Sequence, residues 1–483
     1  MSNKIKTRFA PSPTGYLHIG GLRTALYSYI FAKQNLGKMI LRIEDTDQTR
    51  EVTGAVESLI QTMQKMSLKW DEGPQLNKSL GISEKGQNQS YFQSKRLKIY
   101  QEYAKKLIDN GKAYYCTCSK ARLDELRQEQ MAKGQPPKYD GHCRNQINNE
   151  TKNQINNETT VIRLKIPEQG NVLFNDMVRG EVSIDCSEID DQILIKSDGF
   201  ATYHLASVVD DHLMGITHVI RGEDWLPSTP KHILLYQAFG WQLPEFAHLP
   251  LLLNPDKSKL SKRQGDVAVE DFLAKGYLPE ALINYTALMG WHPQDNQEIF
   301  SLKELIKHFD LKRVQKAGAI FDLEKLNWFN CHYIKQKPVM ELLKLCQSFV
   351  PDTNFKTLKI ILQSQKERLI TISDIKELID SLTKISVYQP NLLIYKKSSK
   401  EKTSQGLRIA LNILTEQIKW DVKIIKSKLE QAVKENNLTN GDLFWPVRVA
   451  LSGQEKSPPP EEIMEIIGKK ESLARISAAV KKL

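Results

Sequence analysis

Cysteine is scarce in this 483-residue chain, and three of its six cysteines lie between residues 116 and 143. So few thiols form no disulfide framework, and reduced cysteines in a cytoplasmic protein are the better interpretation. The sequence also lacks any run of eighteen apolar residues, which excludes a membrane-spanning helix. Residues 1–6 lack the apolar core and cleavage site of a secretory signal, so we expect a protein that is not secreted.

Two common nucleotide-binding motifs are absent as well: the P-loop Gly-Lys-Ser/Thr and the dinucleotide loop Gly-x-Gly-x-x-Gly. Their absence disfavours those two nucleotide-binding folds. Hydrophobic residues make up 40% of the chain and charged residues 26%, which is ordinary for a globular protein. The length predicts two to four domains. The net charge of +11 is compatible with a nucleic-acid partner, although charge alone is weak evidence.

The hydrophobic pattern begins as α/β. Residues 5–10 and 39–44 read as short buried strands, and residues 22–33 between them read as a helix. This strand–helix–strand unit is the opening of a doubly wound parallel sheet. Residues 75–90 are polar and predict a surface loop, whereas residues 203–209 predict a strand.

From about residue 270 onward the pattern is helical, which predicts a separate all-α domain with a boundary near residues 335–340. One segment follows neither pattern. Residues 145–152, Asn-Gln-Ile-Asn-Asn-Glu-Thr-Lys, are repeated almost unchanged as residues 153–160. The duplication is polar and too short for a solenoid, so we interpret it as an exposed loop insertion without function.

The first chemically informative motif is residues 8–21, Arg-Phe-Ala-Pro-Ser-Pro-Thr-Gly-Tyr-Leu-His-Ile-Gly-Gly. Gly20 and Gly21 allow a ligand to approach the backbone, and the helix that follows directs its N–H groups and positive dipole end toward that ligand. His18 can donate a hydrogen bond to a phosphate oxygen. A generic strand-to-helix turn is the alternative, but the length of the string makes it the weaker interpretation.

The second motif is residues 257–263, Lys-Ser-Lys-Leu-Ser-Lys-Arg, about 240 residues downstream. Lys259 and Lys262 are three residues apart, and on a mobile loop both can close over the β- and γ-phosphates of a nucleotide. A stretch of this composition is by itself most often a solvated loop. Paired with the first motif, it predicts a triphosphate clamp.

Together the two motifs resemble those of the class I aminoacyl-tRNA synthetases, and residues 8–21 resemble the bacterial glutamyl-tRNA synthetases in particular. Gly21 stands where class I enzymes usually have a second histidine, a departure that the glutamate enzymes commonly show. In the loop, Leu260 and Arg263 replace the family's methionine and final serine. The resemblance covers nearly the whole chain and is weak at residues 76–90 and 145–160.

The resemblance implies a Rossmann-like, doubly wound parallel-sheet catalytic domain that is split by an insertion, followed by a helical domain. Its two halves would be residues 1–90 and 201–255, with an inserted tRNA acceptor-binding subdomain at 91–200. Residues 256–335 would hold the lysine loop and a stem-contact region. Residues 336–483 would form a helical anticodon-binding domain.

The implied activity is ATP- and Mg²⁺-dependent activation of glutamate to glutamyl-adenylate, followed by transfer to the terminal adenosine of tRNA(Glu). Charging of tRNA(Gln), with a downstream amidotransferase, stays open. The alternatives are a glutaminyl-tRNA synthetase, which should end in β-barrels, and a non-catalytic tRNA-binding relative, which should have a decayed clamp. We expect a monomer. Residues 443–453 resemble the C-terminal region of the family, but this resemblance does not show which residue contacts which anticodon base.

The resemblance also implies roles for individual residues. Catalysis would rest on His18, Lys259 and Lys262. ATP would contact these three together with Gly15, Gly20 and Gly21. Glutamate would contact Arg8, Ala10, Ser12, Glu44, Tyr203, Ser207, Arg221 and Trp225. Arg8 and Arg221 would pair with a substrate carboxylate and Glu44 with the ammonium, because a guanidinium binds a carboxylate bidentately. Ser207 stands where the family leads us to expect asparagine.

Relatives can hold structural zinc in the insertion, and tetrahedral zinc needs four ligands. Cys116, Cys118 and Cys143 supply three thiols. Tyr139 or His142 could be the fourth ligand, while Asn145 stands where some relatives have histidine. An empty thiol cluster is the alternative, and we expect no catalytic cysteine.

Overall fold

The N-terminal apolar segments pair as the sequence predicts. Strand β1 (Lys6–Phe9) and strand β2 (Lys38–Leu41) are parallel and in register, and helix α1 (Ile19–Gln34) connects them. Ten of the α1 residues are buried, because this helix packs against the sheet along most of its length. The predicted strand–helix–strand opening is confirmed.

The structure is a computed structural model that describes residues 4–77, 81–145, 160–260 and 267–483. It divides into two compact units. The α/β unit comprises residues 1–274 and 279–326, and the helical unit comprises residues 275–278 and 327–483. No helix in these described ranges is both long and apolar enough to cross a membrane.

The central sheet of the α/β unit has the strand order β10-β11-β7-β8. Strand β10 (His218–Gly222) runs parallel to β11 (Glu245–Leu249), which is parallel to β7 (Asn171–Asp176). Strand β8 (Gly180–Asp185) closes an antiparallel hairpin with β7. Hydrogen bonds between Lys6 and Thr217 join β1 to the start of β10, so the parallel strands form one layer.

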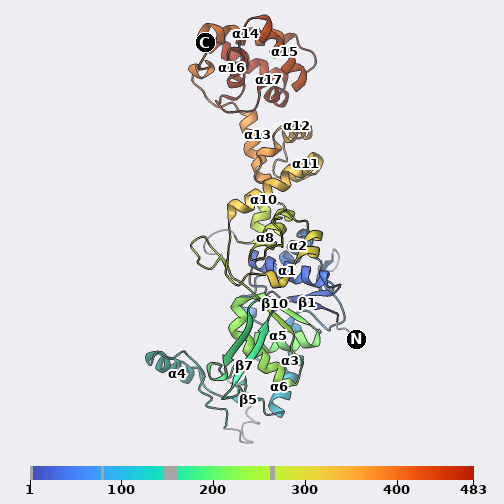
Figure 1. Ribbon diagram of the computed structural model, residues 1–483, viewed down its shortest axis with the longest axis vertical. Coiled ribbons are helices and arrows are strands. Elements are labelled where there is room, and N and C mark those ends of the chain that lie inside the picture. Colours follow the sequence, from blue (N-terminus) through green and yellow to red (C-terminus); the bar gives the residue numbers. More distant parts are fainter. Residues whose placement is uncertain (1–3, 78–80, 146–159, 261–266) are drawn as a thin grey trace. The chain divides into compact units, whose positions relative to one another are not determined.

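Helices cover this layer (Figure 1). They are α3 (Leu97–Asp109), α5 (Tyr203–Leu213) and α6 (Thr229–Phe239). The predicted strand at residues 203–209 is therefore wrong, because this segment is the first two turns of α5. Leu205, Ala206, Val208 and Val209 are buried against one core with α3 and α6, so packing overrides the β-propensity of the two valines.

The predicted loop at residues 75–90 is also wrong in part. Strands β3 (Gly73–Asn77) and β4 (Gly81–Lys85) form an antiparallel hairpin there, next to helix α2 (Ala55–Lys65). Strand β4 has no buried residue and β3 buries only Gly73 and Pro74, so neither has the apolar alternation by which a strand is recognised in a sequence.

Residues 91–200, which the sequence predicts to be an insertion, carry a three-stranded antiparallel sheet of β5 (Ala113–Cys116), β6 (Val161–Leu164) and β9 (Ile193–Ile195). Helix α4 (Lys120–Ala132) follows β5 and has no buried residue. The duplicated segment, residues 145–160, lies outside the described residues except at its two ends.

The α/β unit continues with shorter elements after residue 250. Strand β12 (Leu252–Leu253) is parallel to β13 (Ala319–Ile320). The helices there are α7 (Val269–Ala274), α8 (Pro279–Leu288) and α9 (Leu302–His308).

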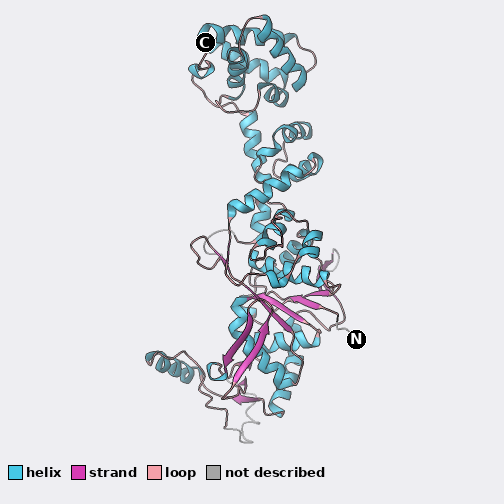
Figure 2. Cartoon of the chain, in the orientation of Figure 1, coloured by secondary structure: helices cyan, strands magenta, loops and turns pink. Residues whose placement is uncertain are grey.

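The helical unit contains only helices and connecting segments in its described residues (Figure 2). They are α10 (Leu323–Gln336, which starts in the α/β unit), α11 (Val339–Gln347), α12 (Phe355–Gln365), α13 (Ile375–Thr383), α14 (Lys400–Glu416), α15 (Val422–Glu435), α16 (Asn440–Ser452) and α17 (Pro460–Lys482). Gly468, with φ 81°, has a non-helical backbone and divides α17 into two helical segments.

Candidate active site

A cavity of about 450 Å³ opens where β1, β10 and the N-terminus of α1 meet. Ligand sites in open α/β sheets occur at this carboxyl edge of the strands. Twelve of the predicted site residues line the cavity: Arg8, Ala10, Ser12, Gly15, His18, Gly20, Gly21, Glu44, Tyr203, Arg221, Trp225 and Lys259. Ser207 does not line it, and Lys262 lies outside the described residues.

His18 is the N-cap of α1. Its Nδ1 accepts a hydrogen bond of 3.0 Å from the backbone N–H of Gly20. In the neutral ring the proton therefore sits on Nε2, which makes that atom a donor. A Cβ at position 20 would lie 3.3 Å from His18 Nδ1, so glycine lets the imidazole lie flat against the helix start. The positive dipole end of the helix and the Nε2–H donor of the imidazole thus both face an anionic ligand in the cavity.

The lysine loop reaches the same cavity from the other side. Lys259 Nζ lies 2.6 Å from Asp224 Oδ1, and both side chains are about half exposed. Leu260 N–H donates to Leu252 O at 2.9 Å, and Ile19 N–H donates to Val267 O at 2.9 Å. The chain on both sides of residues 261–266 is thus hydrogen-bonded to elements that line the cavity.

Arg221, on β10, is one of three buried arginines that line the cavity, at 4% exposure. It makes no ion pair with a carboxylate among the described residues. Toward the cavity, Nη1 donates to Tyr203 Oη at 3.1 Å and Nη2 to Trp225 O at 3.5 Å. A buried guanidinium without an anion is costly, so this position favours an anionic ligand.

Arg8 differs from Arg221 because it is already paired. Its Nε lies 3.2 Å from Asp211 Oδ1, and Asp211 also accepts from Arg42 Nη1 at 2.7 Å. Arg42 Nη2 in turn donates to Glu44 Oε1 at 2.9 Å. Although burial disfavours the charge of Asp211, Arg8 and Arg42 hold the pKa of its carboxyl below the ordinary value. Burial raises the pKa of Glu44, and the positive charges of Arg42 and Arg8 offset part of this rise.

Tyr203 and Trp225 form an aromatic wall, with ring centroids 4.1 Å apart. Burial raises the pKa of Tyr203, so its hydroxyl stays protonated and can donate to a ligand. Ser207 is one turn further along α5 and faces Arg42, whose Nη2 is 3.5 Å from its Oγ. The serine thus lies behind the cavity wall, and a contact with substrate stays a prediction.

Sequence reasoning missed a buried polar cluster behind Arg221. It consists of Asp176, Thr229, His232 and His248, and the half-buried His204, next in the chain to the predicted site residue Tyr203, adjoins it. Nothing in the sequence joins these residues, because up to 72 positions separate hydrogen-bonded partners. The strand register brings them together.

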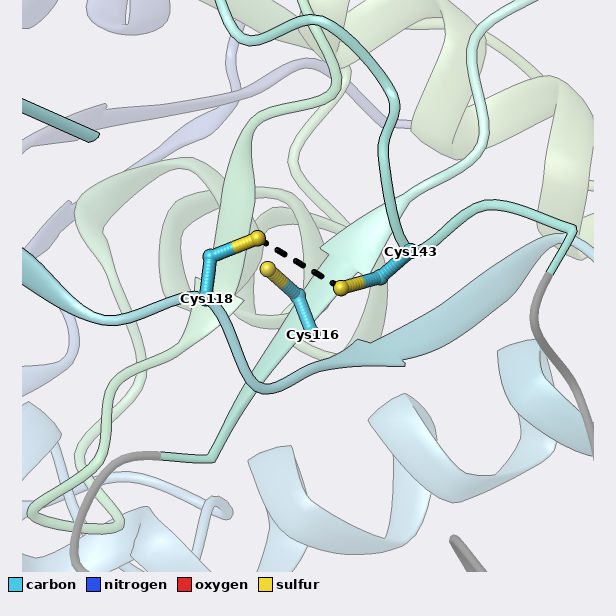
Figure 3. A group of neighbouring side chains, drawn as sticks. All are labelled: Cys116, Cys118 and Cys143. Atoms are coloured by element: carbon cyan, nitrogen blue, oxygen red, sulfur yellow. Dashed lines mark hydrogen bonds between the residues drawn. The ribbon is translucent and has the colours of Figure 1, made fainter. Parts of the chain in front are cut away.

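The three predicted cysteine ligands do come together (Figure 3). The sulfur atoms of Cys116, Cys118 and Cys143 lie within 4.8 Å of one another, and those of Cys118 and Cys143 are 3.5 Å apart. Tyr139 Oη is 3.4 Å from the sulfur of Cys116 and 3.5 Å from that of Cys118. Burial raises the pKa of Cys118 to about 11, so without a metal this group is a thiol.

The helical unit has a cavity of its own, of about 550 Å³. It lies between α16 and the start of α17 and is lined by Tyr395, Phe444 and Trp445 together with Arg448 and Lys426. The guanidinium of Arg448 stacks over the ring of Trp445 at 4.8 Å. Aromatic faces beside cations are suited to splayed, unpaired nucleic-acid bases.

Known proteins resemble this chain in both of its parts. The family model described as "tRNA synthetases class I (E and Q), catalytic domain" matches residues 4–328, and the anticodon binding domain matches residues 341–480. The chain is 48% identical to the glutamate–tRNA ligase of Alkaliphilus metalliredigens and 46% identical to that of Clostridioides difficile. Each alignment covers 98% of both chains.

A solved structure gives the same answer. It is a glutamate tRNA ligase from Elizabethkingia meningosepticum in complex with its amino acid, 36% identical to this chain. It superimposes with a TM-score of 0.88 over 99% of this chain and 100% of that one. The chain therefore belongs to the class I tRNA synthetases for glutamate and glutamine, and within that family to the ATP-dependent glutamate–tRNA ligases.

Proposed function

We propose that this chain activates glutamate with ATP and transfers the glutamyl group to tRNA(Glu), with both reactions in the 450 Å³ cavity. The observation that carries the assignment of the amino-acid site is Arg221. It is buried, faces the cavity and lacks a carboxylate partner among the described residues. A substrate carboxylate supplies the missing anion, bidentately and in a place of low dielectric.

The remaining glutamate contacts follow from charge. Glu44 lines the cavity and would pair with the substrate ammonium, while Arg42 donates to its carboxylate. The Tyr203 hydroxyl donates to the same carboxylate as Arg221. Arg8 is oriented by Asp211, which also neutralises its charge. It therefore offers the substrate a fixed hydrogen-bond donor and not an unpaired positive charge. Ala10 and Ser12 complete the wall.

ATP occupies the half of the cavity at the start of α1. His18 Nε2 donates to a phosphate oxygen, and Gly15, Gly20 and Gly21 leave space for the phosphates beside the helix end. Lys259 leaves Asp224 to contact the phosphates, an exchange that is easy because both groups are half exposed. We propose that Lys262, which lies outside the described residues, joins it there, because the lysine-loop motif pairs it with Lys259.

The chemistry needs no covalent enzyme intermediate. A carboxylate oxygen of glutamate forms a bond to the α-phosphorus, and the bond from that phosphorus to pyrophosphate breaks. The terminal adenosine hydroxyl of tRNA then attacks the glutamyl carbonyl, AMP leaves, and the hydroxyl proton passes to solvent or phosphate. The protein contributes position and positive charge where the phosphates develop negative charge.

Mg²⁺ fits this cavity as a companion of ATP. Glu44 and Asp224 are the carboxylates in the described lining, and each is paired with a cation of the chain. Because Mg²⁺ keeps several waters and binds readily through phosphates, we propose that it enters with the nucleotide and neutralises phosphate charge there.

We also propose structural zinc in the insertion, held by Cys116, Cys118, Cys143 and Tyr139. The three sulfur atoms lie within 4.8 Å of one another and Tyr139 Oη lies within 3.5 Å of two of them, an arrangement that fits a tetrahedral ion with Zn–S bonds of about 2.3 Å. His142 is exposed and does not belong to the sulfur group, which makes Tyr139 the better fourth ligand. Zinc would fix the insertion sheet locally and has no part in the acyl transfer.

The helical unit would read the anticodon in its aromatic cavity. We further propose that the chain acts as a monomer in the cytoplasm, where its six cysteines, none of them in a disulfide, remain reduced. We propose the same domain boundaries as the sequence predicts: residues 1–90, 91–200, 201–255, 256–335 and 336–483.

The test is attachment of labelled glutamate to two transcripts, tRNA(Glu) and tRNA(Gln), with ATP and Mg²⁺. Charging of the first alone indicates a discriminating ligase, and charging of both indicates one that relies on an amidotransferase. Charging of neither would overturn the proposal in favour of a non-catalytic tRNA binder. Arg221→Lys should raise the KM for glutamate by roughly tenfold or more, the loss of one or two charge-assisted hydrogen bonds. Arg313→Lys, at an exposed arginine, is the matched control.

A further inference from the structure

The side of Arg221 that faces away from the cavity is fully occupied by buried side chains. Nε donates to His248 Nε2 at 3.0 Å, Nη1 to His232 Nδ1 at 3.2 Å and Nη2 to Thr229 Oγ1 at 2.9 Å. These three partners are at most 2% exposed, and none of them lines the cavity. The guanidinium is therefore held from behind and offers only its front face to a ligand.

A carboxylate stands behind His248. His248 Nδ1 is 2.6 Å from Asp176 Oδ2, and both side chains are completely buried. Asp176 Oδ1 accepts from the backbone N–H groups of Val178 at 3.0 Å and Arg179 at 2.9 Å. Although burial disfavours its charge, the bond from His248 and these backbone bonds keep the pKa of Asp176 below the ordinary value.

The donor types fix where each proton lies. An arginine Nε can only donate, so His248 Nε2 must accept. The ring proton of His248 is then on Nδ1 and is donated to the ionised Asp176. The result is a directed row, Arg221 to His248 to Asp176, with a positive and a negative end and a neutral imidazole between them.

The row follows from the sheet. Arg221 on β10 and His248 on β11 are register partners on adjacent parallel strands, so their side chains leave the same face. Asp176 is the last residue of β7, the next strand of the sheet, opposite Phe246. Three neighbouring strands thus each supply one member at the edge where ligands bind.

A carboxylate–histidine pair that orients a cation is familiar from metal sites, where the carboxylate fixes the tautomer and direction of the imidazole. We infer that Asp176 and His248 are positioning residues that aim Arg221 at the substrate carboxylate. The inference rests on the proposed role of Arg221 in binding glutamate. His232 steadies Nη1 in the same way, and its other nitrogen is 3.0 Å from His204 Nδ1.

Asp176→Asn tests the row with little change of shape. An asparagine in place of the carboxylate can donate to His248 Nδ1, which moves the ring proton to Nε2. That nitrogen then faces the Nε–H of Arg221, and two donors oppose each other. The same change to the wrong histidine tautomer follows when the aspartate of a Ser-His-Asp triad becomes asparagine. We expect the KM for glutamate to rise about ten- to hundredfold, by analogy with the loss of a carboxylate that orients a metal-binding histidine. The KM for ATP should not change.

His248→Leu and His248→Gln form a matched pair. Leucine removes the acceptor and should raise the glutamate KM as Asp176→Asn does, whereas glutamine places an acceptor oxygen near the position of Nε2 and should recover most of the affinity. Steady-state aminoacylation of tRNA(Glu), with ATP and tRNA saturating and glutamate varied, measures all three variants. Thermal midpoints establish that each variant is folded at the assay temperature.

Coupling to Arg221 separates positioning from a purely structural role. In an Arg221→Lys background, which lacks Nε, His248→Leu should add no further rise in the glutamate KM. Equal and additive KM effects in both backgrounds, or lowered thermal midpoints with an unchanged KM, would overturn the inference. If Arg221→Lys itself leaves the glutamate KM unchanged, the proposed function of Arg221 fails instead, so the two failures are distinguishable.

Discussion

Replacement of Asp211 by asparagine should destabilise the α/β unit more than any surface charge removal. Asp211 is 4% exposed and accepts from two arginines, Arg8 at 3.2 Å and Arg42 at 2.7 Å. Arg96 and Asp210 form the adjoining pair at 2.7 Å. With Glu44, the cluster holds three buried guanidinium groups against three carboxylates.

Asp211→Asn keeps the shape and removes one negative charge, so the cluster is left with an excess buried cation. Breaking a buried ion pair in this way costs about 3–5 kcal/mol of unfolding free energy. The free Arg8 would also lose its orientation at the cavity, so the KM for glutamate should rise. Glu298→Gln is the control, because its pair with Lys325 is about 40% exposed on each side and should contribute at most ~1 kcal/mol.

Calorimetry can follow the transition of the α/β unit separately from that of the helical unit, and aminoacylation gives the KM. The reasoning predicts a large loss for Asp211→Asn and almost none for Glu298→Gln. Equal losses within ~1 kcal/mol would refute the idea that electroneutrality of the buried cluster stabilises this part of the fold.

Three further outcomes follow from the site. Lys262→Ala should lower kcat about a hundred- to thousandfold with the fold intact, while Lys257→Ala should not; unchanged turnover would remove Lys262 from the mechanism. Metal analysis should find one zinc per chain in the wild type and none in Cys143→Ser. Cys331→Ser, which changes a cysteine outside the cluster, is the control and should keep its zinc. A wild-type protein without metal would show that the cluster is an empty group of thiols. Burial lowers the pKa of His204 to about 4, below the unfolded value, so the unfolded state binds a proton first as the pH falls. Acidification from pH 7 to pH 5 should therefore destabilise the α/β unit, and His204→Gln should remove about 2 kcal/mol of that loss in urea titrations.

The predictable parts of the structure are those encoded locally. The β1–α1–β2 opening and the helical unit have strong hydrophobic periodicity. Twelve of the predicted site residues line one cavity, and most of them could be named from the sequence because they belong to two motifs. These residues are recognisable because a phosphate site needs glycine, a helix start and cations close together in the chain.

The failures have a different origin. The segment that forms α5 was predicted as a strand because its valines favour strands. Its helical conformation depends on packing against α3 and α6, and the local sequence carries no information about that packing. The β3–β4 hairpin was missed because neither of its strands buries a full apolar face. Asp176 and His248 gave no local signal at all, since only the pairing order β10-β11-β7 makes them neighbours of Arg221.

Arg221 also has a consequence for selectivity. All five of its N–H groups already have acceptors, and the two at the cavity, the Tyr203 hydroxyl and the Trp225 carbonyl, are uncharged. A ligand must therefore displace an existing acceptor. When Arg221 binds the side-chain carboxylate of glutamate, that charged group is the stronger acceptor and wins this exchange, whereas the side-chain amide oxygen of glutamine in the same place offers no more than the groups it would replace. The empty site thus resists glutamine before any clash or repulsion is involved.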